Sequence, residues 1–245
     1  MRISRLYVAM ELNPGALLEL DEDASHYVRT VLRVRKDAGI ILFNGQGGEF
    51  SATFTEVSKK RVSMKVNEWI NRSVESRLHI NLGLAISRGD RMDFSVQKSV
   101  ELGVNALTPI LTERCVVQLK EDKQAQRLGH WRKIVQHAAE QCGRTILPQV
   151  NPVHDLNQWL DQQKGLKIFL DPHADTSLTE LTPGTMQLTL LSGPEGGFAD
   201  HERQMAITAG FVPVRLGARI LRSETASLAA LAAAQMLWGD FAITD

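Results

Sequence analysis

The sequence of 245 residues contains few cysteines, scattered histidines and no long apolar segment. Its two cysteines, Cys115 and Cys142, form neither a CxxC pair nor a disulfide framework, so we expect reduced thiols and a cytoplasmic location. The seven histidines belong to no HExxH motif or Cys/His cluster, which argues against a metal site. No apolar run approaches the roughly 20 residues of a membrane span, and no signal-peptide pattern opens the chain. The predicted partners therefore include neither a metal ion nor a membrane.

Fingerprints of the commonest nucleotide and hydrolase sites are also missing. The glycine-rich loop at residues 192–197 reads SGPEGG, which does not match GxGxxG, and no GxxxxGKS or GxxxxGKT motif occurs. Ser192 does not lie in a GxSxG turn, so a serine nucleophile is not expected. The sequence thus lacks the usual phosphate cradles for dinucleotides and nucleoside triphosphates.

Charge is unevenly distributed along the chain, although the formal net charge is zero. Residues 1–150 contain 22 Lys and Arg against 17 Asp and Glu, whereas residues 151–245 contain 6 against 11. A basic first part suits a polyanionic partner such as RNA, but solvated surface charge explains an excess of five equally well. The charge pattern alone leaves both interpretations open.

Residues 1–72 are predicted to form a β-rich domain. Apolar and polar residues alternate over residues 50–54 and 62–66, the period-2 pattern of a meander or small barrel. A polar segment without periodicity, residues 71–77, marks the predicted domain boundary.

A predicted helix over residues 21–35 interrupts these strands and carries a basic face. His26, Arg29 and Arg33 follow the helical spacing i, i+3, i+7. Lys59 and Lys60, at a predicted turn, could extend this basic face. It is either a solvated helix surface or a surface that contacts phosphates.

Residues 73–245 are predicted to form an α/β domain with a mainly parallel sheet, because apolar strand-like runs alternate with helical patterns. The predicted strands cover residues 78–86, 106–111, 166–170, 188–191 and 211–216. The predicted helices cover residues 91–102, with Gly103 as a C-cap, then 122–142, 156–163 and an Ala-rich segment at 226–234 with Ser223 as its N-cap.

Two loops after predicted strands form the candidate site. Residues 192–197 read SGPEGG, and residues 217–225 read GARILRSET. Loops at the carboxyl ends of parallel strands are where open α/β sheets bind ligands, and glycine lets the backbone approach a ligand closely. We therefore expect the two loops to lie side by side around a pocket.

Three charged residues of these loops, Arg222, Glu224 and Glu195, are candidates for a catalytic or a structural role. Arg222 can stabilise an anionic base or bind a phosphate, and Glu224 lies in the first turn of a helix, where the dipole favours a carboxylate. The plainer alternative is an ion pair between the two at the helix start. Glu195, between a proline and two glycines, is expected to hold the two loops together by hydrogen bonds rather than to react.

The sequence LLSGPEGGF followed by LGARILRSETASLAAL resembles the paired signature of the SPOUT-class methyltransferases, and more narrowly the RsmE family of ribosomal RNA uridine-N3 methyltransferases. Three upstream segments match that family too: ISRGDRMDFSVQKSVELGV, TERC and EQCGR. The resemblance spans nearly the whole chain. Minor departures are Ser223, where the family often has threonine, and Ala218, where proline or lysine is common.

The resemblance implies both an architecture and partners. Residues 73–245 would form a SPOUT-type parallel-sheet domain with a trefoil knot, and residues 1–72 a small PUA/OB-like β-barrel that binds RNA. The cofactor would be S-adenosyl-L-methionine (SAM). The partners would be small-subunit (16S) ribosomal RNA, in an assembled or assembling 30S particle, and a second copy of the chain in a homodimer.

The resemblance also implies roles for individual residues. Arg222 would stabilise the charge on the uridine, and either Glu224 or a water chain would accept its N3 proton. The residues expected to bind the cofactor are Leu170, Leu191, Gly193, Glu195, Gly196, Leu216, Gly217, Ile220, Leu221 and Thr225. The residues expected to bind RNA are Arg5, His26, Arg29, Arg33, Lys59, Lys60, Arg88, Arg114 and Arg144.

Two other functions remain compatible with the sequence. One is a methyltransferase that acts on tRNA or on a ribose 2′-hydroxyl. The other is a non-catalytic RNA-binding protein of ribosome assembly, which would not bind SAM.

Overall fold

The computed structural model describes residues 3–117, 119 and 121–242. The chain divides into two compact units, and each is described by itself. Unit 1 comprises Met1–Glu75 and Ala139–Leu147, and unit 2 comprises Ser76–Ala138 and Pro148–Asp245. The sequence did not predict that residues 139–147 would join the first unit.

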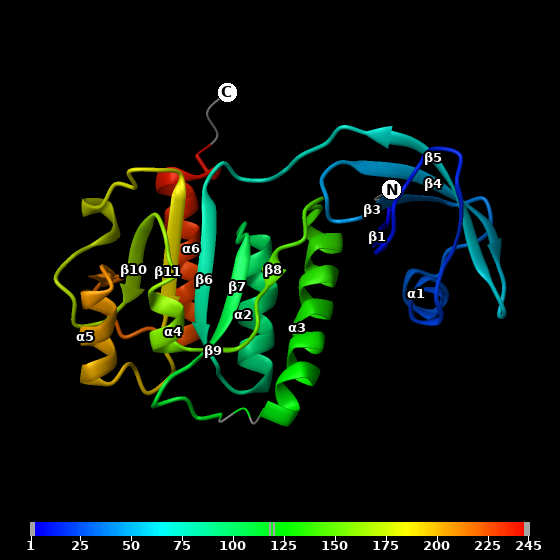
Figure 1. Ribbon diagram of the computed structural model, residues 1–245. Helices are drawn as coiled ribbons and strands as arrows, with labels where there is room; N and C mark the ends of the chain where they lie inside the picture. Colours follow the sequence, from blue (N-terminus) through cyan, green and yellow to red (C-terminus); the bar gives the residue numbers. More distant parts are fainter. Residues whose placement is uncertain (1–2, 118, 120, 243–245) are drawn as a thin grey trace. The chain divides into compact units, whose positions relative to one another are not determined.

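Unit 1 is built on a five-stranded sheet with the order β1-β3-β4-β5-β2 (Figure 1). The strands are β1 (Arg5–Tyr7), β2 (Leu17–Glu19), β3 (Gly39–Phe43), β4 (Glu49–Val57) and β5 (Val62–Ile70). The predicted meander is β3-β4-β5, which is antiparallel, whereas β1 pairs with β3 in parallel. The alternating apolar residues face a buried core that includes Phe54, Met64 and Val66.

The predicted helix at residues 21–35 is regular only in its first part. Asp21 caps α1 (Glu22–Tyr27) by accepting a hydrogen bond from the Ala24 amide at 2.8 Å. The chain then continues as a π-helix, η1 (Val28–Leu32), and Arg33 adopts the left-handed conformation with φ 51°. The spacing i, i+3, i+7 therefore does not describe one straight helical face, and that part of the prediction is wrong.

Residues 139–147, which include the end of α3 (Glu121–Cys142), are tied into unit 1 by ion pairs. Glu49, a buried residue on β4, pairs with Arg5 and, at 3.2 Å, with Arg72. Arg144 pairs with Glu75 at 2.5 Å, and its backbone carbonyl accepts a hydrogen bond from Arg5. Buried charges need such partners, so these contacts explain why the segment packs here.

Unit 2 contains a parallel sheet with the order β12-β10-β11-β6-β7-β8, and β9 (His154–Asp155) also pairs with β7. The strands are β6 (His79–Ala85), β7 (Ala106–Leu111), β8 (Gln149–Val150), β10 (Leu166–Leu170), β11 (Gln187–Ser192) and β12 (Val212–Val214). The strands read as apolar runs because helices cover both faces of the sheet. The predicted parallel α/β fold is confirmed, and the trefoil knot stays a prediction.

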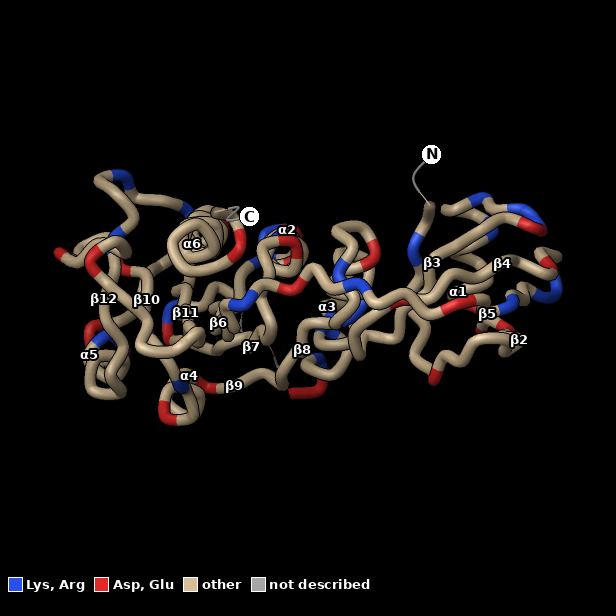
Figure 2. The backbone as a smooth tube through the Cα atoms, turned by 90° about the horizontal axis from the view of Figure 1, so that it is seen from above, with Lys and Arg blue, Asp and Glu red and all other residues tan. Residues whose placement is uncertain are grey.

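Helices lie on both faces of this sheet (Figure 2). Helices α2 (Gly89–Glu101) and α6 (Ser223–Trp238) cover one face, and α4 (Leu156–Leu160) and α5 (Asp200–Thr208) cover the other. Gly103 follows α2 with φ +84°, as expected of a residue that ends a helix. Helix α5 was not predicted.

The Ala-rich helix α6 makes the close contacts that its small side chains allow. Gln235 on α6 is fully buried, donates to the Leu102 carbonyl at 3.0 Å and accepts from the Ser76 hydroxyl at 2.8 Å. The prediction that Ser223 caps this helix is wrong, because the N-cap is Arg222 and Ser223 is the first helical residue. Among the described residues, no helix has both the length and the apolar character needed to cross a membrane.

Candidate active site

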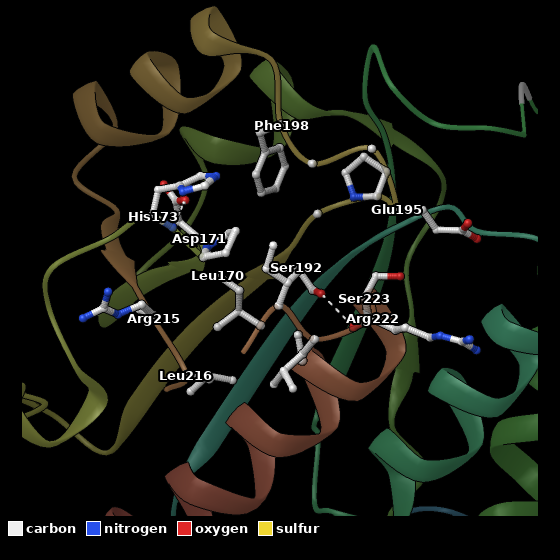
Figure 3. A pocket seen from close by; sticks show the side chains of 18 of the residues that line it. Leu170, Asp171, His173, Ser192, Glu195, Phe198, Arg215, Leu216, Arg222 and Ser223 are labelled. Carbon is white, nitrogen blue, oxygen red and sulfur yellow. Dashed lines mark hydrogen bonds between the residues drawn. The ribbon is translucent and has the colours of Figure 1, made fainter. Parts of the chain in front are cut away.

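A cavity of about 740 Å³ opens at the carboxyl ends of β10, β11 and β12 in unit 2. Its walls come from the three loops that follow these strands and from the start of α6 (Figure 3). This volume lies within the range of sites for drug-sized ligands and cofactors. The two predicted loops are thus brought together around a pocket, and the loop after β10, which starts beyond Leu170, a residue also expected to bind the cofactor, completes it.

The loop after β10 contributes the buried carboxylate of Asp171. The Asp171 amide donates to the Val214 carbonyl at 3.0 Å, which fixes this loop against β12. Its carboxylate, in a side chain 4% exposed, accepts from the His173 amide at 2.9 Å and lies 2.5 Å from the Arg203 guanidinium. The ion pair with α5 therefore holds one wall of the cavity.

The conformation of the glycine-rich loop after β11 requires residues without side chains at two positions. A Cβ atom on Gly193 would lie 2.8 Å from the Phe198 ring, and Gly197 adopts φ +68°. Arg114, in the TERC segment, donates to the carbonyls of Gly196 and Phe198 at 3.3 and 3.4 Å. The loop is therefore shaped by close packing on one side and held by an arginine on the other.

A buried glutamate fixes the start of α5 behind this loop. Glu202 accepts hydrogen bonds from the amides of Ala199 at 2.9 Å and Glu113 at 2.8 Å. It thereby joins the TERC segment to the residues that follow the glycines. This explains in structural terms why TERC accompanies the glycine-rich loop in the sequence signature.

The loop after β12 supplies apolar and cationic side chains. Leu216 and Leu221 are half-buried and line the cavity together with Leu170. Ile220 also lines it, although its side chain is 81% exposed. The exposed arginines of the cavity lining on this loop are Arg215, Arg219 and Arg222. The site thus combines an apolar wall with a positive rim, which suits a heterocycle next to an anionic substrate.

Arg91, which belongs to helix α2, lies close to two carboxylates: one in the β11 loop and one at the start of α6. Arg91, near the start of α2, lies 2.6 Å from the Glu195 carboxylate and 4.0 Å from that of Glu224. Glu195 was predicted to hold the two loops together, and it contacts Arg91. The two loops also meet directly, because the Ser192 hydroxyl donates to the Ser223 carbonyl at 3.5 Å (Figure 3). The described residues include no ion pair between Arg222 and Glu224, which was the plainer alternative.

Most residues predicted to bind the cofactor line the cavity. They are Leu170, Gly193, Glu195, Gly196, Leu216, Ile220 and Leu221. Leu191, Gly217 and Thr225 do not line it. Leu191 is fully buried in the middle of the sheet, where β11 pairs with both β10 and β6, so its backbone is engaged in strand pairing. Of the two predicted catalytic residues, Arg222 lines the cavity and Glu224 does not.

The residues predicted to bind RNA fall into three groups. Arg114 lines the cavity, and exposed Arg88 precedes α2. Arg29 donates to the carbonyls of Ser58 and Lys59 at 3.0 and 2.6 Å, which brings η1 beside the β4–β5 turn. His26, Arg33, Lys59 and Lys60 are exposed in the same unit. Arg5 and Arg144 are instead occupied by the buried ion pairs of unit 1, so we remove both from the RNA surface.

Several residues of the cavity lining were missed at the sequence level. They are Asp171, His173, Phe198, Arg203, Arg215 and Arg219. Asp171 and His173 lie in the loop after Leu170, which was expected to border the cofactor, but the prediction named no residue of that loop beyond Leu170. Arg203 lies on α5, which was not predicted. Among the described residues, no cluster of three metal-binding side chains occurs.

Family comparisons match both parts of the chain. The sequence model of an RNA methyltransferase domain matches residues 74–235, and that of an RNA methyltransferase PUA domain matches residues 20–66. The chain is 35% identical over 242 residues to the ribosomal RNA small subunit methyltransferase E of Buchnera aphidicola subsp. Acyrthosiphon pisum, covering 98% of this chain and 96% of the relative. It is 31% identical over 229 residues to the protein of the same name from Bacillus subtilis, covering 88% and 90%.

Two solved structures with SAM bound are similar over nearly the whole chain. A methyltransferase from Legionella pneumophila superposes with a TM-score of 0.95 and 39% identity, covering 98% of this chain and 100% of that chain. A ribosomal RNA small subunit methyltransferase E from Neisseria gonorrhoeae superposes with a TM-score of 0.91 and 40% identity, with the same coverage.

Proposed function

The chain belongs to the ribosomal RNA small subunit methyltransferase E family, and from this premise we propose that it transfers the methyl group of SAM to N3 of a uridine in small-subunit ribosomal RNA. It is a SAM-dependent ribosomal RNA methyltransferase. The observation that carries the proposal is the cavity formed by the loops after β10, β11 and β12.

The residues of this cavity fit SAM. Leu170, Leu216 and Leu221 form an apolar wall suited to an adenine ring, and the three glycines of the β11 loop line the cavity without side chains. When bound, SAM supplies an electrophilic methyl group on a sulfonium. Binding donor and acceptor in one pocket supplies much of the acceleration, because it fixes their relative orientation.

Methylation at N3 requires the uridine to be unpaired, because N3 carries the proton that pairs within a helix. The N3 proton must leave, and we propose that Arg222 stabilises the negative charge that develops on the base. Its side chain lies at the cavity beside the start of α6, where the helix dipole also favours an anion. Glu224 lies off the cavity wall and beside Arg91, so we favour a water chain as the proton acceptor.

Unit 1 is the proposed RNA-binding part of the protein. The contacts of Arg29 place η1 and the β4–β5 turn together, so the exposed cations Arg33, Lys59 and Lys60 share one region of that unit. Such a set of cations suits phosphate contacts that carry no sequence information. Base recognition would then fall to the cavity rim in unit 2.

Reversing two of these charges should weaken RNA binding in a salt-dependent way. In the double variant Arg33→Glu, Lys60→Glu, we expect the slope of log K against log salt to become shallower by about 0.7 to 0.9 for each phosphate that the variant no longer neutralises. Arg29 is left intact because it also supports the β4–β5 turn. The slope is measured by fluorescence anisotropy with a fragment of small-subunit RNA, and Lys164→Glu in unit 2 is the control. A slope equal to that of the parent would exclude this surface.

A homodimer and an assembled or assembling 30S substrate are further parts of the proposal, as is a cytoplasmic location. Exposed Phe94 on α2 and exposed Met236 and Leu237 on α6 lie on the two helices that cover one face of the sheet. Large exposed apolar side chains on neighbouring helices favour association with a second copy. Light scattering tests this, because a dimer has twice the 27.2 kDa mass of the chain.

Mass mapping of ribosomal RNA tests the target nucleotide. RNA from a strain that lacks this gene is treated with purified protein and SAM, as free RNA and as 30S particles. A gain of one methyl group on a uridine base of the small-subunit RNA is expected. Methylation of tRNA or of a ribose would support the first alternative function. No methylation together with no thermal shift on adding SAM would support the non-catalytic one.

A further inference from the structure

We infer that Arg91 is a positioning residue that clamps the β11 loop to the start of α6 and thereby holds the cavity in the shape that binds the cofactor. This inference rests on the proposed function, because it assigns the cavity to SAM. It adds a residue that the sequence signature did not assign to the cofactor site.

The clamp starts from an element that belongs to neither loop. Arg91 lies in the first turn of α2, a helix that packs against α6 on one face of the sheet. Its Nη1 atom lies 2.6 Å from Oε1 of Glu195, in the loop after β11. Its Nε atom lies 4.0 Å from Oε1 of Glu224, in the first turn of α6. One guanidinium thus faces a carboxylate of the β11 loop and a carboxylate at the start of α6.

The glycine-rich loop needs a restraint of this kind. Gly196 and Gly197 are exposed, and glycine restricts its own backbone less than any other residue. Arg114 holds the same loop through two backbone carbonyls, but it makes no described contact with α6. Arg91 is therefore the residue, among those described, whose ion pairs join the β11 loop to the start of α6.

Charge explains why the clamp must be a cation. Glu195 and Glu224 both approach the same guanidinium, and without it the two carboxylates would repel each other. The three side chains are only partly exposed, 32% for Glu195, 14% for Glu224 and 41% for Arg91, so water screens this repulsion incompletely. Removing the Glu195 charge together with the Arg91 charge should therefore relieve the repulsion between the two carboxylates.

The test compares Arg91→Met, Arg91→Lys and Arg91→Met combined with Glu195→Gln. SAM affinity and dissociation rate are measured by calorimetry and stopped flow, and kcat and KM for SAM are measured with 30S particles. For Arg91→Met we expect Kd and KM for SAM to rise about tenfold with kcat nearly unchanged. Arg91→Lys should retain most of the affinity, and the double variant should recover part of the loss. Arg127→Met, an arginine on α3 outside the cavity lining, is the matched control.

Equal SAM affinity in Arg91→Met and the parent would overturn the inference. A double variant that binds SAM no more tightly than Arg91→Met would also overturn it. If Arg91→Met does not fold, Glu195→Gln alone decides, because Glu195 lies in an exposed loop: a weaker Kd supports the clamp and an unchanged Kd refutes it. A parent protein that neither binds SAM nor methylates RNA would contradict the proposed function instead, so the two failures are distinguishable.

Discussion

Replacing Arg222 by methionine is expected to lower the rate of methyl transfer by a factor of about 10² to 10³, the usual cost of losing one preorganised donor to a developing charge. SAM affinity should stay close to that of the parent. The apolar wall and the glycine-rich loop that are proposed to hold SAM do not include this side chain.

The position of Arg222 supports this separation of roles. Its backbone is extended, with φ −65° and ψ 153°, and it directly precedes the first residue of α6. Its side chain lines the cavity, and no ion pair occupies it within the described part of the chain. The guanidinium is therefore free to meet an anionic base.

The measurement is single-turnover transfer of labelled methyl to small-subunit particles, with calorimetric SAM binding on the same preparations. Arg222→Lys keeps the charge but not the planar fork, so an intermediate rate is expected. Arg127→Met again serves as the control. If Arg222→Met transfers methyl groups at nearly the parental rate, the stabilising role is wrong.

A side chain at Gly193 is expected to block the cofactor. The Cβ atom of any replacement would meet the Phe198 ring at 2.8 Å, with two more ring atoms at 3.1 Å. Phe198 is buried and packs edge-on against Phe169, with ring centroids 5.9 Å apart, so it cannot move freely into the core. Either the loop or the ring must shift towards the cavity.

For Gly193→Ala we expect SAM affinity to fall by about tenfold, and for Gly193→Val by about a hundredfold, as for overpacking of 1 to 3 kcal/mol. Gly184→Ala is the matched control, because a Cβ atom there meets nothing within 4 Å and its backbone is unstrained. Calorimetry with SAM decides the result. Parental affinity in Gly193→Val would mean that SAM does not depend on the packing of this loop.

The sequence predicted the sheet of unit 2 and the position of its ligand site well. Strands buried on both faces read as apolar runs bounded by glycine, proline or charged residues, and β7 and β10 have the bounds that such runs indicated. The position of the site could be predicted from these strands, because parallel strands bring the loops at their carboxyl ends to the same edge of the sheet. Helix α5 was missed because it has a weakly amphipathic sequence and follows the glycines directly.

Contacts between distant segments were beyond sequence reasoning. Arg5 and Arg144 were predicted to bind RNA, but each forms a buried ion pair with a carboxylate from elsewhere in unit 1. The π-helix after Tyr27 was equally hidden, since residue spacing assumes a regular helix. Leu191 was expected from the family resemblance to bind the cofactor, and the structure adds that strands pair with it on both sides. In each case a tertiary partner, absent from the local pattern, decides the role.

Hydrogen exchange of the backbone amides with and without SAM tests most directly whether the three loops form the cofactor site. We expect slower exchange on adding SAM at residues 171–173, 192–198 and 215–222, with the sheet of unit 1 unaffected. SAM binding accompanied by protection in other segments, while these three exchange as before, would contradict this assignment.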